Sequence, residues 1–139
     1  PVMESLDVCI VGAEWGEGKR AQWMTSFIIA CRNKETDELL TIGKVGTGIK
    51  ELKGQGVTFQ QLTDFLKNDV LEEKGKSITL KPHLVIEVQY EEIQKSPTYT
   101  SGYALRFPRF IRLREDRNPH NCSTLAQVEE FFKDQRNRN

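Results

Sequence analysis

The hydrophobic pattern of this chain changes period near its middle, and that change limits the folds open to it. From Thr58 onward apolar residues recur every three or four positions, as on one face of an α-helix. The segments on both sides are short apolar runs, which are typical of strands. Thr58 and Gln61 match a capping box, which predicts where the helix begins. The sequence therefore predicts a helix between two groups of strands.

Three strands are expected before this helix and two after it, because five runs are rich in β-branched or aromatic residues and end in polar or glycine-containing turns. The five expected strands cover residues 6–12, 26–32, 39–46, 83–90 and 103–114. In the last of them Pro108 has no N–H to donate, which predicts a sheet edge or a bulge. A closing helix is expected after Thr124, which forms a second capping box with Gln127.

This order of elements predicts a mainly β fold with two helices. It matches a five-stranded Greek-key barrel of the oligonucleotide-binding type (OB-fold), with a helix between strands 3 and 4 and a second helix at the C-terminus. A small open sheet with two helices on one face is the alternative that the same order permits. The chain has 139 residues, which is the size of one domain, so we expect a single domain over residues 1–139.

Composition and charge exclude several classes of protein. Lysine plus arginine and aspartate plus glutamate each total 20, so the net charge is zero and no general attraction to nucleic acid is expected. No apolar run is long enough to span a bilayer, and the first residues lack a signal-peptide pattern, so no membrane partner is expected. The 3 cysteines have no C-x-x-C spacing, which argues against a disulfide framework or a zinc site and favours an intracellular location.

The least common feature is a group of arginines in the last expected strand, within a stretch that contains no acid. They are Arg106, Arg109, Arg112 and Arg114. Side chains two residues apart share one face of a strand, so Arg112 and Arg114 are expected to line up for phosphate oxygens. The alternative is a solvated strand face whose arginines pair with acids such as Glu115 or Asp116.

Two glycine-rich segments carry further basic residues. Lys19 and Arg20 follow two glycines in the first turn, where exposed backbone amides and side chains suit an anion. The spacing does not match a Walker A loop, and a hairpin tip with surface cations is the alternative. Lys44 lies in a second glycine-rich segment, residues 43–48, at the end of the third expected strand and within reach of a phosphate.

No complete enzyme is expected from these residues alone. Neither His83 nor His120 has a metal-ligand partner at a suitable spacing, so no metal site is expected. Adjacent acidic pairs point in different directions, and no spacing brings a histidine to a cysteine.

Five ordered segments carry a resemblance to a known family. They are residues 6–13 (LDVCIVGA), 18–21 (GKRA), 44–48 (KVGTG), 96–97 (SP) and 104–116 (ALRFPRFIRLRED). Together they resemble the C-terminal OB domain of ATP-dependent DNA ligases of the archaeal and eukaryotic replicative type, over nearly the whole chain. The first segment resembles the family's motif Va and the last resembles its motif VI.

The resemblance implies an enzyme that seals nicks in three steps: adenylation of a lysine by ATP with release of pyrophosphate, transfer of AMP to a 5′-phosphate, and attack by the 3′-hydroxyl. The adenylated lysine belongs to a K-x-D-G motif in a preceding nucleotidyltransferase domain. No lysine here is followed by x-Asp-Gly, so this chain alone is not expected to be catalytic and looks like one domain of a longer ligase. ATP and Mg²⁺ are the implied cofactors of the parent enzyme, and this domain alone is expected to bind neither.

Motif VI implies that three arginines, Arg109, Arg112 and Arg114, face the β- and γ-phosphates of ATP when the domain closes over the adenylation site. A leaving pyrophosphate gains negative charge, which fixed guanidinium groups stabilise. Asp116 ends the motif, and its implied role is to position the arginines, with a surface ion pair as the alternative.

The family also implies that the domain turns another face to the minor groove of nicked duplex DNA. Phe107 matches an aromatic residue that wedges against the sugars, whereas the pattern alone favours a core position for it. Contacts to DNA phosphates are implied for Arg106, Lys19, Arg20 and Lys44. Glu14 and Glu17 beside the first turn depart from the family pattern.

The implied partners are nicked double-stranded DNA and the nucleotidyltransferase domain of the same ligase, and a sliding clamp is left open. The implied location is intracellular: the nucleoid of an archaeal cell or the nucleus of a eukaryotic one. The alternative function is a stand-alone OB module for single-stranded nucleic acid, with Trp15, Trp23 and Tyr103 among its stacking rings. A protein-interaction barrel whose arginines form only ion pairs is a third reading.

Overall fold

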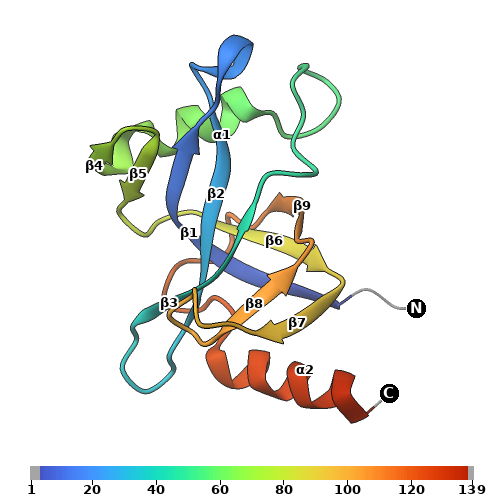
Figure 1. Cartoon of the computed structure of the whole chain (residues 1–139). Helices are drawn as coiled ribbons and strands as arrows, with labels where there is room; N and C mark the ends of the chain where they lie inside the picture. Colours follow the sequence, from blue (N-terminus) through green and yellow to red (C-terminus); the bar gives the residue numbers. More distant parts are fainter. Residues whose placement is uncertain (1–3, 138–139) are drawn as a thin grey trace.

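The computed structural model describes residues 4–137, and within this range seven strands form one antiparallel sheet while two more form a separate ribbon (Figure 1). The strands are β1 (Glu4–Trp15), β2 (Met24–Arg32), β3 (Leu39–Val45), β4 (Val70–Lys74), β5 (Ser77–Leu80), β6 (Val85–Tyr90), β7 (Glu92–Lys95), β8 (Tyr103–Arg106) and β9 (Arg109–Leu113). The helices are α1 (Phe59–Leu66) and α2 (Leu125–Asn137), with 3-10 turns η1 (Gly18–Arg20) and η2 (Lys67–Asp69).

β1 organises the large sheet because it pairs with three other strands. Its first half, residues 4–9, pairs with β6, and its second half pairs with β2 and β5. A register shift between Ile10 and Gly12 bends the strand between these two halves. A side chain at Gly12 would begin 3.1 Å from the Ile78 carbonyl oxygen, so this crowded crossing favours glycine. β9 joins the sheet through β6, at the edge beyond the first half of β1.

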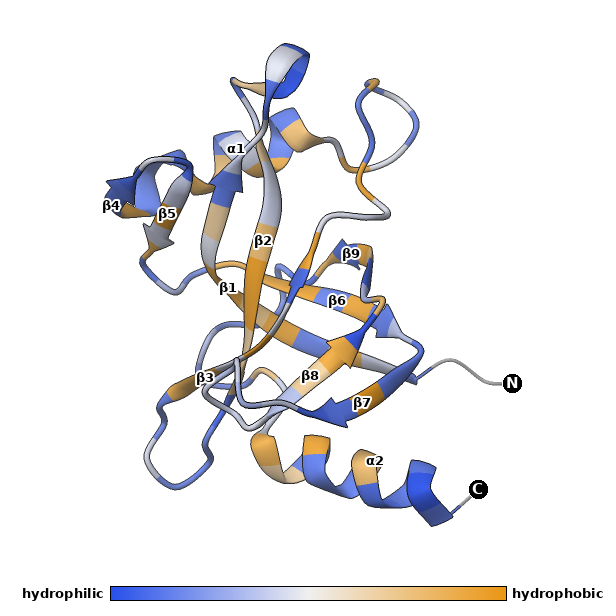
Figure 2. Ribbon diagram, viewed as in Figure 1, coloured by the Kyte–Doolittle hydropathy of each residue, from blue (hydrophilic) through white to orange (hydrophobic). Residues whose placement is uncertain are grey.

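The core lies inside the bent sheet and is closed by a helix at each end (Figure 1). Fully buried side chains such as Ile10, Phe27 and Ile86 come from the paired strands. Three residues of α1 are among the buried apolar side chains, and α2 contributes Val128. Figure 2 shows hydrophobic residues along β2 and β8, while β4 and the C-terminal end of α2 are hydrophilic.

The predicted fold class, mainly β with two helices, is confirmed. Both predicted capping boxes are present. The Thr58 hydroxyl accepts a hydrogen bond from the Gln61 N–H, and the Thr124 hydroxyl accepts one from the Gln127 N–H. The helices lie at opposite ends of the molecule (Figure 1), with α1 against β2 of the large sheet and α2 against β7 of the ribbon, so they do not share one face of a sheet.

The structure adds a hairpin that the sequence pattern does not predict. The helix ends at Leu66, and Val70, which fits the helical spacing, instead begins the β4–β5 hairpin. Most of β4 is exposed and polar, so it shows no alternation that would mark it as a strand. β7 also lies outside the predicted strands.

The predicted strand over residues 103–114 is wrong in one respect, because the chain breaks within it. β8 pairs with β7 in the separate ribbon, whereas β9 pairs with β6 in the large sheet. Between them Phe107 has a positive φ of 50°, and Pro108 follows with no N–H for a sheet bond. The edge or bulge expected at Pro108 is therefore a change of sheet.

Candidate functional site

The arginines of β9 lie at the edge of the large sheet, beside β6. Opposite the step from Glu87 to Val88 the register shifts, so that Val88 faces Phe110 and Glu87 faces Arg112. This bulge leaves Phe110 buried and Arg112 exposed, although simple alternation would place both on one face. The break before β9 and the bulge within it together determine which arginines face outward.

Arg112 and Arg114 are held by carboxylates from three parts of the chain. Arg112 Nε donates to Glu87 Oε1 at 2.7 Å. Arg114 Nη1 donates to Asp7 Oδ1 at 3.0 Å. Arg114 also donates from Nε and Nη2 to the two carboxylate oxygens of Asp116, each at 3.1 Å. Most of the donors of Arg114 are therefore already engaged.

Arg117 extends this group, because its Nε lies 3.7 Å from Asp7 Oδ2. Asp7 and Glu87 are direct cross-strand neighbours on β1 and β6, so the carboxylates lie in a row beneath the arginines. We refer to these six residues as the arginine–carboxylate network. It consists of Arg112, Arg114, Arg117, Asp7, Glu87 and Asp116. Three positive and three negative groups make the network neutral overall.

The hydrogen bonds of the network shift the pKa values of two carboxyl groups. Hydrogen bonds from Arg114 lower the pKa of Asp116 to about 2. A hydrogen bond from Arg112, followed by one from Ser5, lowers the pKa of Glu87 below its usual range. Both carboxylates are therefore charged at neutral pH and hold their arginines in place.

Arg109 differs from the other arginines of β9, since it has no ion-pair partner among residues 4–137. Arg109 lies beside Thr47. The Thr47 carbonyl accepts a hydrogen bond from the Phe110 N–H at 2.9 Å, and the Thr47 hydroxyl donates one to the Pro108 carbonyl at 3.0 Å. At Gly48, with a φ of 87°, a Cβ would lie 2.2 Å from the Phe110 carbonyl oxygen. The 44–48 and 104–116 segments, far apart in sequence, are thus packed together.

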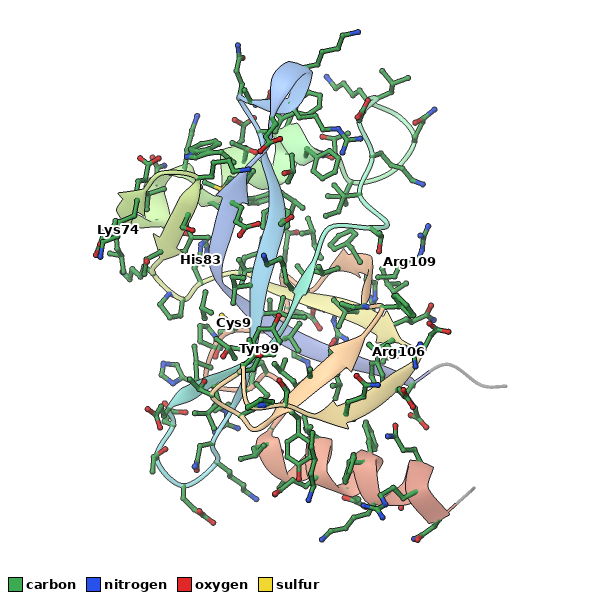
Figure 3. The ribbon with its side chains drawn as sticks, viewed as in Figure 1. Cys9, Lys74, His83, Tyr99, Arg106 and Arg109 are labelled. Atoms are coloured by element: carbon green, nitrogen blue, oxygen red, sulfur yellow. The ribbon has the colours of Figure 1, made fainter. Side chains whose placement is uncertain are left out.

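Phe107 stands out of the surface at the break between β8 and β9. It is 65% exposed, so the alternative in which it belongs to the core is wrong. The Arg106 guanidinium carbon lies 5.0 Å from the centre of its ring, and Arg106 Nη1 donates to Glu92 Oε1 at 3.0 Å. Figure 3 shows Arg106 and Arg109 at the edge of the molecule where β8 gives way to β9.

The predicted basic residues of the two glycine-rich segments are exposed, with Lys19 and Arg20 in η1 and Lys44 in strand β3. Arg20 pairs with Glu51 and lies over the Phe59 ring, whereas Lys44 Nζ contacts Glu14 Oε2 at 3.0 Å. Lys19 has no ion-pair partner in the described part of the chain. η1 lies at the α1 end of the molecule (Figure 1), so the structure does not bring Lys19 and Arg20 together with β9.

The aromatic rings expected for single-strand binding are engaged within the protein. Trp15 donates from its indole N–H to Glu73 at 2.7 Å. Trp23 donates to Gln60 and stacks on Phe59, with 6.0 Å between ring centres. Tyr103 packs against a phenylalanine of α2. Rings occupied in this way are poor platforms for unpaired bases.

The sequence pattern missed Asp7, Glu87 and Arg117. Asp7 lies between Leu6 and Val8, and Glu87 lies between Ile86 and Val88, so each is an acid flanked by apolar residues, and that contrast is the signal that points to them. Arg117 follows the arginine-rich strand at a turn. It lines an open cavity of about 610 Å³, together with Arg114, Lys81 and His83.

Other chemistry has little support among the described residues. Within residues 4–137 no three His, Cys, Asp or Glu side chains gather to hold a metal ion. Burial raises the pKa of Cys9 and of Cys31 to about 12, which keeps both thiols protonated at neutral pH. His83 and His120 pair with Asp69 and Asp37 respectively. No described helix is long and apolar enough to cross a membrane.

Comparison with known proteins identifies the family. The family model described as "ATP dependent DNA ligase C terminal region" matches residues 20–117. The DNA ligase of Nanoarchaeum equitans is 49% identical over 138 residues, which cover 98% of this chain and 24% of that protein. The DNA ligase of Archaeoglobus fulgidus is 46% identical over 132 residues, covering 95% and 23%. This chain therefore spans about a quarter of the length of these relatives.

Solved structures agree on the fold. The ligase domain of M. tuberculosis LigD has a TM-score of 0.67 and 24% identity, covering 86% of this chain and 38% of that one. A mycobacterial DNA ligase D complexed with ATP and MES has a TM-score of 0.63 and 22% identity, covering 88% and 38%. The family model matches well over half of the chain, and by that match this protein belongs to the family of ATP-dependent DNA ligase C-terminal regions.

Proposed function

We propose that this chain is the C-terminal OB domain of an ATP-dependent DNA ligase and that it serves two steps of nick sealing with two surfaces. The arginines of β9 face the β- and γ-phosphates of ATP during lysine adenylation. Phe107, with Arg106, Lys19, Arg20 and Lys44, contacts nicked duplex DNA during sealing. The observation that carries the proposal is the break at Phe107 and Pro108, which separates an exposed ring from the arginines held on the sheet.

The adenylation role is supported by the geometry of the arginines. ATP supplies the AMP group, and the departing pyrophosphate gains charge as the bond to the α-phosphate breaks. Guanidinium groups fixed beforehand stabilise that charge without a cost of reorganisation during the reaction. Arg109 has no ion pair in the described chain, and Arg112 has one, so both keep donors for phosphate oxygens. Arg114 faces the same way with its remaining donors.

The DNA role is supported by the exposure of Phe107. An apolar ring that enters the minor groove offsets part of the cost of deforming the duplex, because it buries its own surface. Arg106 lies against the ring and would follow it to the DNA backbone. Lys19, Arg20 and Lys44 add phosphate contacts that do not read sequence. Because the net charge is zero, we expect duplex binding by this chain to be weak and salt-sensitive.

The remaining parts of the proposal concern partners and place. The nucleotidyltransferase domain of the same enzyme is the proposed partner during adenylation, and no Mg²⁺ ligand is assigned to this chain. A sliding clamp is a further proposed partner without an assigned surface. The proposed location is intracellular, in the nucleoid of an archaeal cell, which fits the archaeal relatives and the three buried free thiols.

A domain replacement tests the proposal. The matching quarter of the N. equitans DNA ligase is replaced by this chain, and the chimera is compared with the same ligase lacking that quarter. The account predicts that the chimera forms enzyme-AMP from labelled ATP and seals a nicked duplex, whereas the truncated ligase does neither efficiently. A chimera no more active than the truncated ligase, with tight binding of single-stranded oligonucleotide by this chain, would instead favour the single-strand binding module.

A further inference from the structure

We propose that Asp7 is a positioning residue for the adenylation step. Its carboxylate holds Arg114 and Arg117 at the end of β9 in the orientation in which they meet the phosphates of ATP. This inference rests on the proposed function and deepens it, because it assigns a role in that step to a residue of β1.

Asp7 serves the two arginines with separate oxygens. Oδ1 accepts from Arg114 Nη1 at 3.0 Å, and Oδ2 lies 3.7 Å from Arg117 Nε. The side chains of Asp7 and Arg114 are only 17% and 14% exposed, so water screens this contact less than it screens a surface ion pair. A single carboxylate between two guanidinium groups also reduces their mutual repulsion.

The backbone of Asp7 is fixed on two sides. Asp7 lies opposite Glu87 in the pairing of β1 with β6. Its N–H donates to Ser123 Oγ at 2.9 Å, and its carbonyl accepts from the Ser123 N–H at 2.8 Å. Asp7 is therefore tied both to the sheet and to the segment that follows the network, and its carboxylate has little freedom to move.

Asp116, the other carboxylate on Arg114, has a different position. It is two residues from Arg114 in the chain and its side chain is 68% exposed, so it moves with the arginine. It orients the plane of the guanidinium group within its own turn. The backbone N–H of Arg114 donates to the Val85 carbonyl of β6 at 2.9 Å, whereas its guanidinium group reaches the sheet through the Asp7 carboxylate. Asp7 therefore sets where the guanidinium group of Arg114 lies relative to the sheet.

The arginines that Asp7 holds border an open space. Arg114 and Arg117 line the cavity of about 610 Å³, and Lys81 lines it as well. In the described chain Lys81 has no ion-pair partner. Charged groups must be fixed before the reaction if they are to stabilise a developing charge, and Asp7 supplies that fixing from behind the arginines.

The test uses the chimeric ligase with Asp7→Asn, which keeps the size of the side chain and one acceptor but removes the charge and the second carboxylate oxygen. Two rates are measured: formation of enzyme-AMP from ATP, and sealing of a nick that is already adenylated, which needs no ATP. We expect the first rate to fall about tenfold to 100-fold, as misplaced catalytic groups typically cause. We expect the second to change less than about twofold. Sealing also reports that the domain is folded.

Two further variants sharpen the result. Asp7→Glu keeps the charge, and we expect it to retain more adenylation than Asp7→Asn. Asp64→Asn makes the same chemical change in an exposed pair with Lys67, and we expect it to alter neither rate. Equal loss of both rates in Asp7→Asn would assign Asp7 a purely structural role and overturn the proposal, as would unchanged adenylation. If Arg112→Ala slows adenylation while Asp7→Asn does not, the proposed function stands and only this inference fails.

Discussion

The arginines in and directly after β9 and the basic residues of the two glycine-rich segments differ in how the protein holds them. Arg114 is largely buried and bonds to carboxylates on β1 and in the following turn. Lys44 and Arg20 make single pairs with Glu14 and Glu51 at the surface, where both partners are partly exposed. Exposed pairs of this kind contribute only about 0 to 1 kcal/mol each, so their side chains reorient readily.

This difference fits two kinds of phosphate contact. Charges that stabilise a leaving pyrophosphate act best when they are fixed before the reaction. Charges that follow a DNA backbone without reading sequence act best when their side chains adapt. The domain thus fixes Arg112 and Arg114 with carboxylates that are largely shielded from solvent, whereas Lys44 on β3 and Arg20 in η1 are adaptable cations in more exposed pairs. The predictions below test this division.

The largest expected effect is on adenylation. Arg112→Ala removes an outward-facing guanidinium group from β9, and we expect the rate of enzyme-AMP formation by the chimeric ligase to fall about 100-fold, the loss typical when one charge-stabilising donor is removed. Single-turnover adenylation with labelled ATP measures the effect. An unchanged rate would mean that the arginines of β9 form only ion pairs.

A smaller effect is expected at Phe107, where the chain breaks between β8 and β9. Phe107→Gly removes the exposed ring and suits the positive φ, so we expect about tenfold weaker binding of nicked duplex while the free energy of unfolding changes by less than about 1 kcal/mol. Leu71→Gly is the control, because Leu71 is 64% exposed, close to the 65% of Phe107, and lies on the β4–β5 hairpin. Fluorescence anisotropy and urea unfolding measure the two quantities. Equal weakening by both variants would remove the special role of Phe107.

A weaker effect is expected at Lys44, an exposed residue of β3. Lys44→Ala removes one adaptable phosphate contact, so we expect about two- to threefold weaker duplex binding and a salt dependence reduced by about one unit of slope. Lys74→Ala, which breaks a similar exposed pair with Glu72, is expected to leave both unchanged. Loss of adenylation in Lys44→Ala would contradict the division between fixed and adaptable cations.

The smallest effect concerns pH. The pKa of Asp116 is about 2 in the folded chain, below its ordinary value of 3.8, so its contribution to stability is present above about pH 4 and is lost as pH falls through about 2. Asp116→Asn should therefore lower the urea midpoint at pH 7, and the difference from the native chain should shrink as pH approaches 2. A difference independent of pH would show that Arg114 does not depend on the charge of Asp116.

Much of the fold is predictable from local signals. The capping boxes at Thr58 and Thr124 locate both helix starts, because they depend on residues three positions apart. The β4–β5 hairpin is not predictable in this way, since its first strand is exposed and polar and lacks a buried face. The break at Phe107 is hidden for another reason: Pro108 marks an irregularity, but whether the chain bulges or changes sheet depends on distant pairing with β6 and β7.

The candidate site shows the same contrast. Some of its residues stand out in the local sequence, and others are brought in only by pairing with distant strands. The sequence shows an unusual run of basic residues at Arg109, Arg112 and Arg114. It does not show which acids balance their charge. Asp7 lies 107 positions from Arg114 in the sequence, and only the folding of β1 against β6 brings it there. The exposure of Phe107 is likewise a result of the bend, since an aromatic residue in a strand pattern is ordinarily assigned to the core.

The most direct test compares Arg112→Ala and Phe107→Gly in the same chimeric ligase, with adenylation and sealing of a pre-adenylated nick measured side by side. The account predicts opposite patterns: Arg112→Ala slows adenylation and spares sealing, whereas Phe107→Gly spares adenylation and slows sealing. If both variants slow both steps in parallel, the two surfaces do not serve separate steps. The proposed division of roles between the β9 arginines and Phe107 is then wrong.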